Sequence, residues 1–65
     1  MLPGKVTKFD EAKGLGTVTA ENGHDYVFHV IEIADGTRTI EIGQQVRFQP
    51  LAKFGRFQAC KVRKV

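Results

Sequence analysis

The chain has 65 residues, of which 42% are hydrophobic, and its ten basic and seven acidic residues give a net charge of +3 at pH 7. A chain this short buries only about 60% of the surface that its unfolded form exposes, so its core cannot enclose a deep substrate pocket. The positive charge is compatible with a polyanionic partner, although a small protein can carry such a charge for solubility alone.

The single cysteine, Cys60, excludes an internal disulfide, and no Cys/His cluster has the spacing of a metal site. The alternation around Cys60 predicts a structural thiol within a strand. The N-terminus has no apolar stretch typical of a secretory signal, and the longest apolar run, residues 26–33, is too short to span a bilayer. We therefore expect a cytoplasmic protein without a metal, a cofactor or a membrane partner.

The first half of the chain has the pattern of three short strands. They are expected at residues 5–9, 16–20 and 26–30. In the second of these strands, Val18 lies on the face opposite Thr17 and Thr19. Asn22 and Gly23 then predict a tight hairpin turn before the third strand.

The stretch after the third strand is less regular. Ile31 and Ile33 are spaced to form one short turn of helix, and residues 34–37 predict a turn. We expect Ile40 and Ile42 to anchor this crossing loop to the core.

Two further strands are predicted in the last third of the chain. Residues 45–49 alternate, with Val46 and Phe48 inward, and Pro50 either ends this strand or marks it as an edge. Residues 57–65 alternate again. One side carries Lys61 and Arg63, and the other carries Cys60, Val62 and Lys64.

Five short strands without a helix of useful length favour a small closed barrel, because closure removes exposed strand edges. Gly14 and Gly16 fit a strongly coiled second strand. The prediction is therefore an all-β, five-stranded antiparallel Greek-key barrel of the OB type, with residues 1–65 as a single domain. An SH3-like barrel is the alternative.

An ordered set of residues extends this prediction over nearly the whole chain. The set comprises Gly4-Lys5-Val6, Phe9-Asp10, Lys13-Gly14-x-Gly16-x-Val18, Asp25, His29, Ile33, Asp35-Gly36, Arg38-Thr39, Gly43-Gln44-x-Val46-x-Phe48 and Gln58-Ala59-x-x-Val62. In this pattern the chain resembles the bacterial cold-shock proteins. The resemblance implies an OB barrel that binds single-stranded RNA or DNA and acts as an RNA chaperone or as a regulator of transcription or translation.

The resemblance also implies a binding face made of aromatic rings on the first three strands, surrounded by lysines. Most of those rings are replaced in this chain. The replacing residues are Lys8, at the family's exposed Trp, and Leu15, Thr17, Val27, Val30 and Thr37, where the family usually has Phe or another aromatic residue. Phe9, Lys13 and His29 keep their type. Phe28 is expected in the core, because an outward Phe28 would bury His29.

The loss of rings predicts weak binding. Stacking of a base on an aromatic ring contributes about 1–3 kcal/mol, so contacts to phosphate must supply most of the remaining affinity. Phe54 and Phe57, flanked by Lys53 and Arg56, could form a displaced stacking site, or their rings could cover the barrel end. His24 is expected to be solvated. The remaining basic residues, Lys5, Lys61, Arg63 and Lys64, either form a solvated exterior or extend the electrostatic surface.

The predicted nucleic-acid-binding residues are therefore Lys8, Phe9, Lys13, Leu15, Thr17, Val27, His29, Val30, Arg56 and Phe57. The aliphatic part of this set also suits a protein partner or a homodimer. An enzyme is the least supported class, because no nucleophilic triad, phosphate-binding loop or pair of catalytic carboxylates is recognisable.

Overall fold

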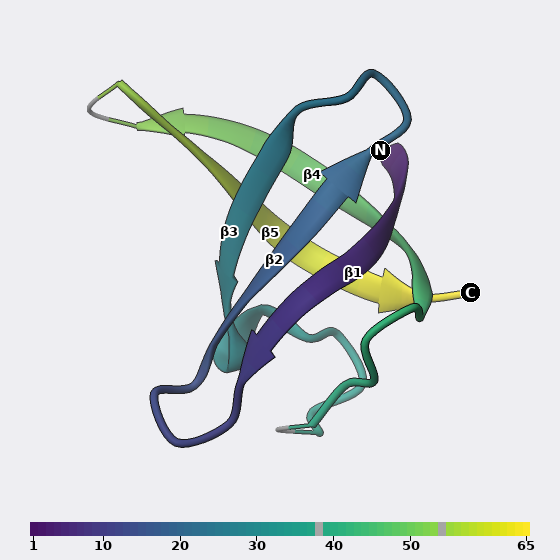
Figure 1. Ribbon diagram of the computed structural model, residues 1–65, viewed down its shortest axis with the longest axis vertical. Coiled ribbons are helices and arrows are strands. Elements are labelled where there is room, and N and C mark those ends of the chain that lie inside the picture. The colour runs from purple at the N-terminus through teal and green to yellow at the C-terminus, as the bar shows by residue number, and fades with distance from the viewer. Residues whose placement is uncertain (38, 54) are drawn as a thin grey trace.

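The computed structural model describes residues 1–37, 39–53 and 55–65, which form five strands and one short 3-10 helix (Figure 1). In chain order these are β1 (Leu2–Asp10), β2 (Leu15–Ala20), β3 (Asp25–His29), η1 (Val30–Glu32), β4 (Gln45–Lys53) and β5 (Arg56–Lys64). Within the described residues, no helix is long and apolar enough to cross a membrane.

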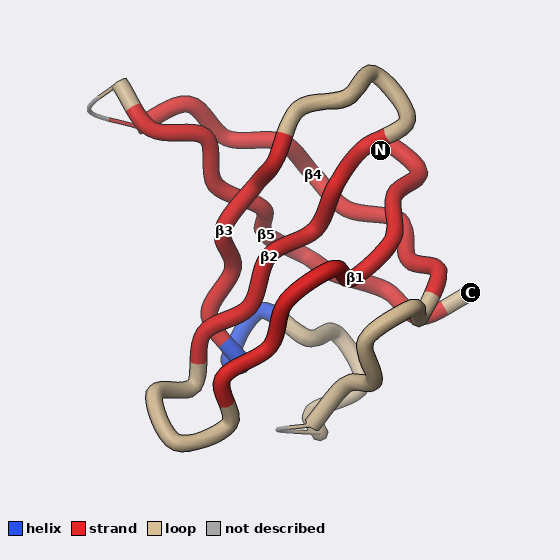
Figure 2. Tube along the Cα trace, viewed as in Figure 1, coloured by secondary structure: helices blue, strands red, loops and turns tan. Residues whose placement is uncertain are grey.

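The strands close into a barrel in the order β1-β2-β3-β5-β4, which confirms the predicted five-stranded architecture. Neighbouring strands are antiparallel except β3 and β5, which meet in parallel through the pair Val27 and Gln58. Figure 2 shows the outer part of the β4–β5 hairpin extending beyond the body of the barrel.

The barrel interior is filled by aliphatic side chains around two buried rings. Phe28 and Phe48 are 1% and 0% exposed, which confirms that both point inward. A Cβ added to Gly16 would lie 2.5 Å from the Phe28 ring, so the ring packs against the bare backbone of β2. The other buried hydrophobic residues are Val6, Val18, Ala20, Tyr26, Ile33, Ile40, Val46, Ala59 and Val62.

The first and third strands differ from their predicted bounds. β1 is longer than expected, and its pairing with β2 shifts between Val6 and Lys8, which leaves Thr7 as a bulge. β3 ends one residue early, because Val30 begins η1 and its amide donates to the Gly14 carbonyl oxygen at 2.9 Å. The helical turn predicted from Ile31 and Ile33 is therefore present, shifted by one residue.

The prediction that Pro50 ends its strand is wrong, since β4 continues to Lys53. Pro50 pairs with Ala59 of β5, whereas β1 pairs only with residues 45–48 of β4. The outer part of β4 is thus an edge. The alternative interpretation of Pro50 as an edge marker is confirmed.

The strict alternation predicted for the last strand is wrong. Arg47 pairs with Arg63 and Gln49 with Cys60, so β5 has one residue more than β4 in this interval. Lys61 lies in this bulge and has a φ of 51°, in the left-handed region. Cys60 is partly exposed within the strand, and its thiol donates to the Gln49 carbonyl oxygen at 3.6 Å.

The crossing loop is anchored by Ile40, which is 6% exposed. The same expectation for Ile42 is wrong, because this side chain is 66% exposed. The Gln44 amide donates to the Glu41 carbonyl oxygen at 3.1 Å, and the Gly43 amide donates to the Val6 carbonyl oxygen at 2.7 Å. The resulting tight turn directs Ile42 to solvent.

The turn predicted at residues 34–37 is present and is tied to the end of β5. The Gly36 amide donates to the Ile33 carbonyl oxygen at 3.1 Å. The Lys64 ammonium lies 3.2 Å from the Asp35 carboxylate and donates to the Thr37 hydroxyl at 3.0 Å. We call these three residues the loop clamp.

Candidate nucleic-acid interface

The outer faces of β1, β2 and β3 bring most of the predicted binding residues together. Lys8 pairs with Thr17, which pairs with Val27, and these three residues form one row across the sheet. Leu15 pairs with His29 in the next row. Directly paired residues of antiparallel strands lie on the same face. Lys8, Val27 and His29 are exposed, so both rows face outward.

The floor of this face is a shallow hollow of about 320 Å³. Its lining residues are Lys8, Phe9, Asp10, Lys13, Leu15, Gly16, Thr17 and Val27. We call it the central hollow. Its base is largely apolar, with Val27 44% exposed, and two lysines stand among its lining residues.

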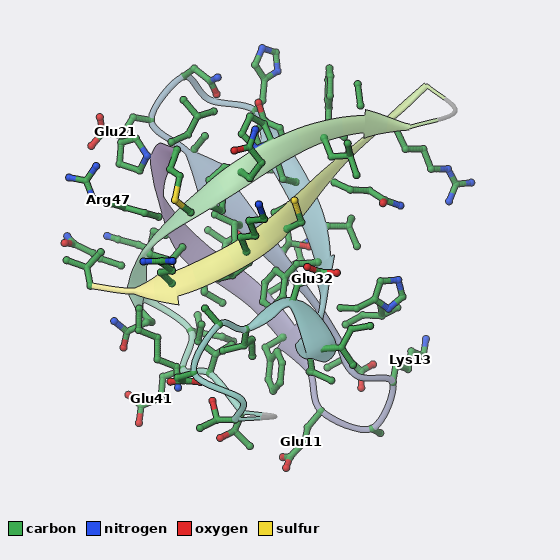
Figure 3. All side chains as sticks on the ribbon, turned by 180° about the vertical axis from the view of Figure 1, so that it is seen from behind. Glu11, Lys13, Glu21, Glu32, Glu41 and Arg47 are labelled. Carbon is green, nitrogen blue, oxygen red and sulfur yellow. The ribbon has the colours of Figure 1, made fainter. Side chains whose placement is uncertain are left out.

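A second hollow adjoins the first at the loop between β1 and β2. Lys13 borders both hollows, while His29 and Val30 line only the second. Figure 3 shows Lys13 and Glu11 extending outward from this loop. Val30 lies in η1, is half-buried and packs against the core, so the expectation that it stands beside Val27 on the strand face is wrong.

Phe9 is half-buried and packs against the core cluster. Phe9 lines the central hollow, and it also lines a separate hollow together with Ile40 and Lys64. Phe9 is therefore a ring with limited access for a ligand.

Arg56 and Phe57 lie on the hairpin, outside the lining of both hollows. Phe57 is 50% exposed, and its ring centroid lies 5.6 Å from those of His24 and Tyr26. Tyr26 in turn contacts the buried Phe48 at 4.9 Å. Phe57 therefore covers the barrel end with one part of its ring and exposes another. Phe54, which was expected to form a stacking site together with Phe57, lies outside the described residues.

The contact between His24 and Phe57 was not expected from the sequence. His24 follows a hairpin turn, and its exposure agrees with the expectation of a solvated side chain. A turn and a strand separated by over thirty residues carry no local pattern that predicts this pairing.

A hydrogen-bonded polar row borders the two rows of the interface. The Thr19 hydroxyl donates to the Asp25 carboxylate at 2.6 Å and lies 3.0 Å from the Thr7 hydroxyl. Sequence reasoning missed this row, because the bulge at Thr7 brings its side chain toward Thr19.

The face carries acidic residues beside its lysines. Lys8 and Lys13 lie near Asp10, which lines the central hollow, and Glu11, which lines its neighbour. Among the residues that the structure describes, no group of three or more His, Cys, Asp or Glu side chains is placed to hold a metal ion. The arrangement offers an apolar floor with cationic edges and presents no catalytic constellation.

Comparison with known proteins agrees with this geometry. A family model described as the 'Cold-shock' DNA-binding domain matches residues 2–65. The chain is 37% identical over 67 aligned residues to the cold shock-like protein CspA of Stigmatella aurantiaca, covering 100% of this chain and 98% of that protein. It is 42% identical over 50 residues to the cold shock-like protein CspD of Bacillus cereus, covering 75% of this chain and 76% of that protein.

A solved structure shares the same architecture. Drosophila Unr CSD456 superposes with a TM-score of 0.82 at 25% sequence identity, over 98% of this chain and 26% of that longer chain. The chain therefore corresponds to about a quarter of the chain in that solved structure.

Proposed function

Because the chain belongs to the cold-shock domain family, which is a family of nucleic-acid-binding domains and not of enzymes, we propose that it binds single-stranded RNA or DNA. We propose that residues 1–65 do so as a single cold-shock-like domain. The observation that supports this proposal is the central hollow, in which an apolar floor lies beside Lys8 and Lys13. Bases can lie on such a floor while the lysines contact phosphates.

The proposed binding is weak and mainly electrostatic. Leu15, Thr17 and Val27 provide area for a base but no aromatic ring, and each lost stacking contact removes about 1–3 kcal/mol. Each phosphate of a single strand that a cationic side chain neutralises contributes about −0.7 to the slope of log affinity against log salt concentration. Lys8 and Lys13 by themselves thus contribute a factor of about seven to the fall in affinity between 50 and 200 mM salt.

Weak binding with little base preference suits a protein that contacts many RNA segments briefly. We therefore propose a role as an RNA chaperone or as a regulator of transcription or translation. The residues that we assign to the nucleic acid are Lys8, Phe9, Lys13, Leu15, Thr17, Val27, His29 and Val30 around the two hollows, with Arg56 and Phe57 on the hairpin.

The proposal is tested by restoring two rings. Fluorescence anisotropy with a labelled oligothymidylate should show weak binding to the unmodified protein at 50 mM salt and much weaker binding at 200 mM. The double substitution Thr17→Phe/Val27→Phe should raise affinity at least tenfold, because two stacking contacts return. Ile42→Phe serves as a control that adds a ring at an exposed position outside both hollows. An unchanged affinity in the double variant would show that nucleic acid does not bind this face.

A second candidate function is protein interaction or self-assembly. Val27 is 44% exposed above a largely apolar hollow, and an aliphatic surface of this kind also suits a protein partner or a second copy of the chain. The two functions differ in whether an introduced charge at Val27 changes the oligomeric state.

A further inference from the structure

The positive charge of the chain is concentrated in β4 and β5. Residues 45–65 contain six of the ten basic residues and none of the seven acidic residues. Residues 1–44 contain the other four basic residues and all seven acidic residues. The strands that form the central hollow are therefore not the source of the overall positive charge.

Two arginines face each other across β4 and β5. Arg47 pairs directly with Arg63, and both side chains are exposed. Val46 and Phe48, the neighbours of Arg47, are buried, so Arg47 points away from the barrel. Directly opposed residues have Cβ atoms about 4.5–5.5 Å apart, and like charges in this position oppose folding. Within the described residues, neither arginine has an acidic partner within 4.0 Å.

Lys61 adds a third cation beside this pair. It lies in the β5 bulge two residues before Arg63 and is exposed. A bulge redirects the side chain that it carries, so Lys61 does not follow the regular alternation of the strand. We call Arg47, Lys61 and Arg63 the basic ribbon.

Two acidic residues lie near the basic ribbon without neutralising it. Glu21 lines a hollow together with Arg47, and Figure 3 shows both side chains at the same edge of the molecule. Glu32 accepts a hydrogen bond from the backbone amide of Lys61 at 3.3 Å. Lys64, by contrast, is engaged in the loop clamp. The basic ribbon therefore keeps an excess of positive charge.

We propose that the basic ribbon is a second contact surface for the phosphodiester backbone of nucleic acid, separate from the central hollow. Arginine is suited to this role because its planar guanidinium donates two parallel hydrogen bonds to phosphate. The row that joins Lys8, Thr17 and Val27 continues through Gln58 to Leu51, so paired residues lead from the central hollow onto β5 and β4. Along these two strands, Arg63 follows Gln58 by five residues and Arg47 precedes Leu51 by four. A strand bound in the central hollow can thus follow the barrel onto the outer face of the hairpin. This inference rests on the proposed function.

The test neutralises the arginine pair with Arg47→Gln/Arg63→Gln and measures the affinity for a labelled oligothymidylate of about twenty nucleotides at several salt concentrations. Losing two phosphate contacts should reduce the steepness of the salt dependence by about 1.4. The factor by which affinity falls between 50 and 200 mM salt should then be about seven times smaller in the variant than in the unmodified protein. The matched control is Thr39→Glu/Ile42→Glu, which lowers the net charge by the same amount at exposed positions of the crossing loop. This control should leave the slope nearly unchanged.

Loss of folding cannot explain the expected result, because removing the opposed like charges should leave the melting temperature unchanged or raise it. Arg63→Glu provides a second variant, since it places opposite charges across the strands while weakening nucleic-acid binding. If the unmodified protein binds and Arg47→Gln/Arg63→Gln has the same salt slope, the basic ribbon is not a contact surface for nucleic acid. The proposed function would remain intact. Absence of any oligothymidylate binding at 50 mM salt by the unmodified protein would overturn both. Arginine-dependent binding to phosphatidylserine vesicles without an effect on the oligonucleotide would also overturn this inference.

Discussion

At the scale of single residues, Gly16 sets the orientation of the candidate interface. The Phe28 ring occupies the space in which any side chain at position 16 would lie, so Phe28 stays inside the barrel. Because side chains alternate along a strand, Val27 and His29 must then face outward. One residue without a side chain therefore decides which residues of β3 a ligand can reach.

Lys61 is the residue at which the backbone departs most from what its side chain prefers. Among the described residues it is the one non-glycine residue with a positive φ, 51°. The left-handed conformation costs a residue with a Cβ about 1–2 kcal/mol relative to glycine. We expect Lys61→Gly to be more stable than Lys61→Ala by about 1 kcal/mol in urea unfolding, since both variants lose the same charge. Equal stabilities would mean that position 61 carries no backbone strain.

At the scale of elements, regular strands were predicted well and irregular ones were not. Alternation alone placed Phe28 and Phe48 in the core, because β3 and the first part of β4 are regular. The same reasoning failed in β5, where Ala59 and Val62 are both buried although they are three positions apart, because the bulge at Lys61 adds a residue without altering the polar pattern. It failed at Ile42 because backbone hydrogen bonds of a tight turn, which leave no mark in hydrophobicity, decide where that side chain points.

In the candidate site, too, some residues lie where they were predicted and others do not. Lys8, Thr17 and Val27 lie together as the resemblance to the cold-shock proteins implied, although the bulge at Thr7 that aligns Lys8 with Thr17 was not predicted. Val30 was misplaced, since the strand ends where its amide bonds to Gly14. The packing of Phe57 on His24 joins segments that are distant in the sequence, and only the folded barrel reveals it.

The loop clamp links the crossing loop to β5 in a pH-dependent way. The Thr37 hydroxyl and amide, together with Lys64, lower the pKa of Asp35 from 3.8 to about 2. A carboxyl group with a lower pKa in the folded state stabilises the fold above its unfolded pKa, and this contribution is lost as the pH falls through the folded pKa. The stabilisation should therefore be complete above about pH 5 and be lost progressively as the pH falls to about pH 1, below the folded pKa.

We expect Asp35→Asn to melt at a lower temperature than the unmodified protein at pH 6, and the difference to vanish near pH 1, below the folded pKa of Asp35. Thermal unfolding followed by circular dichroism across this range measures the difference. Glu41→Gln is the control, because it removes a carboxylate of the same loop whose side chain forms no ion pair within the described residues. A difference between Asp35→Asn and the unmodified protein that is as large at pH 1 as at pH 6 would contradict the assignment to Asp35.

At the scale of the whole molecule, the barrel presents two surfaces of different chemistry. The central hollow is largely apolar and has acidic and basic residues at its rim, whereas the outer face of β4 and β5 carries basic residues and no acidic ones. An aromatic platform would provide both base stacking and a ligand path on a single face. Here stacking area and positive charge are separated, so binding energy depends on how far a strand extends around the barrel.

The oligomeric state decides between the two candidate uses of the central hollow. If the hollow binds nucleic acid as a monomer, light scattering after size exclusion should give a monomer mass at all protein concentrations. Val27→Asp should then leave this mass unchanged and weaken oligothymidylate binding, because a carboxylate repels phosphate at an exposed site. A concentration-dependent dimer that Val27→Asp dissociates would favour self-assembly over nucleic-acid binding.

The junction between β3 and β5 has a consequence for how the chain folds. β1, β2 and β3 pair with their neighbours in sequence, and so do β4 and β5, but the barrel closes only through the β1–β4 and β3–β5 pairs. These pairs join segments about thirty or more residues apart. Long-range pairing carries a larger loop-closure entropy, which slows folding relative to local contacts. The row of paired residues from Val27 through Gln58 to Leu51 crosses this junction, so it exists only after the slowest contacts have formed.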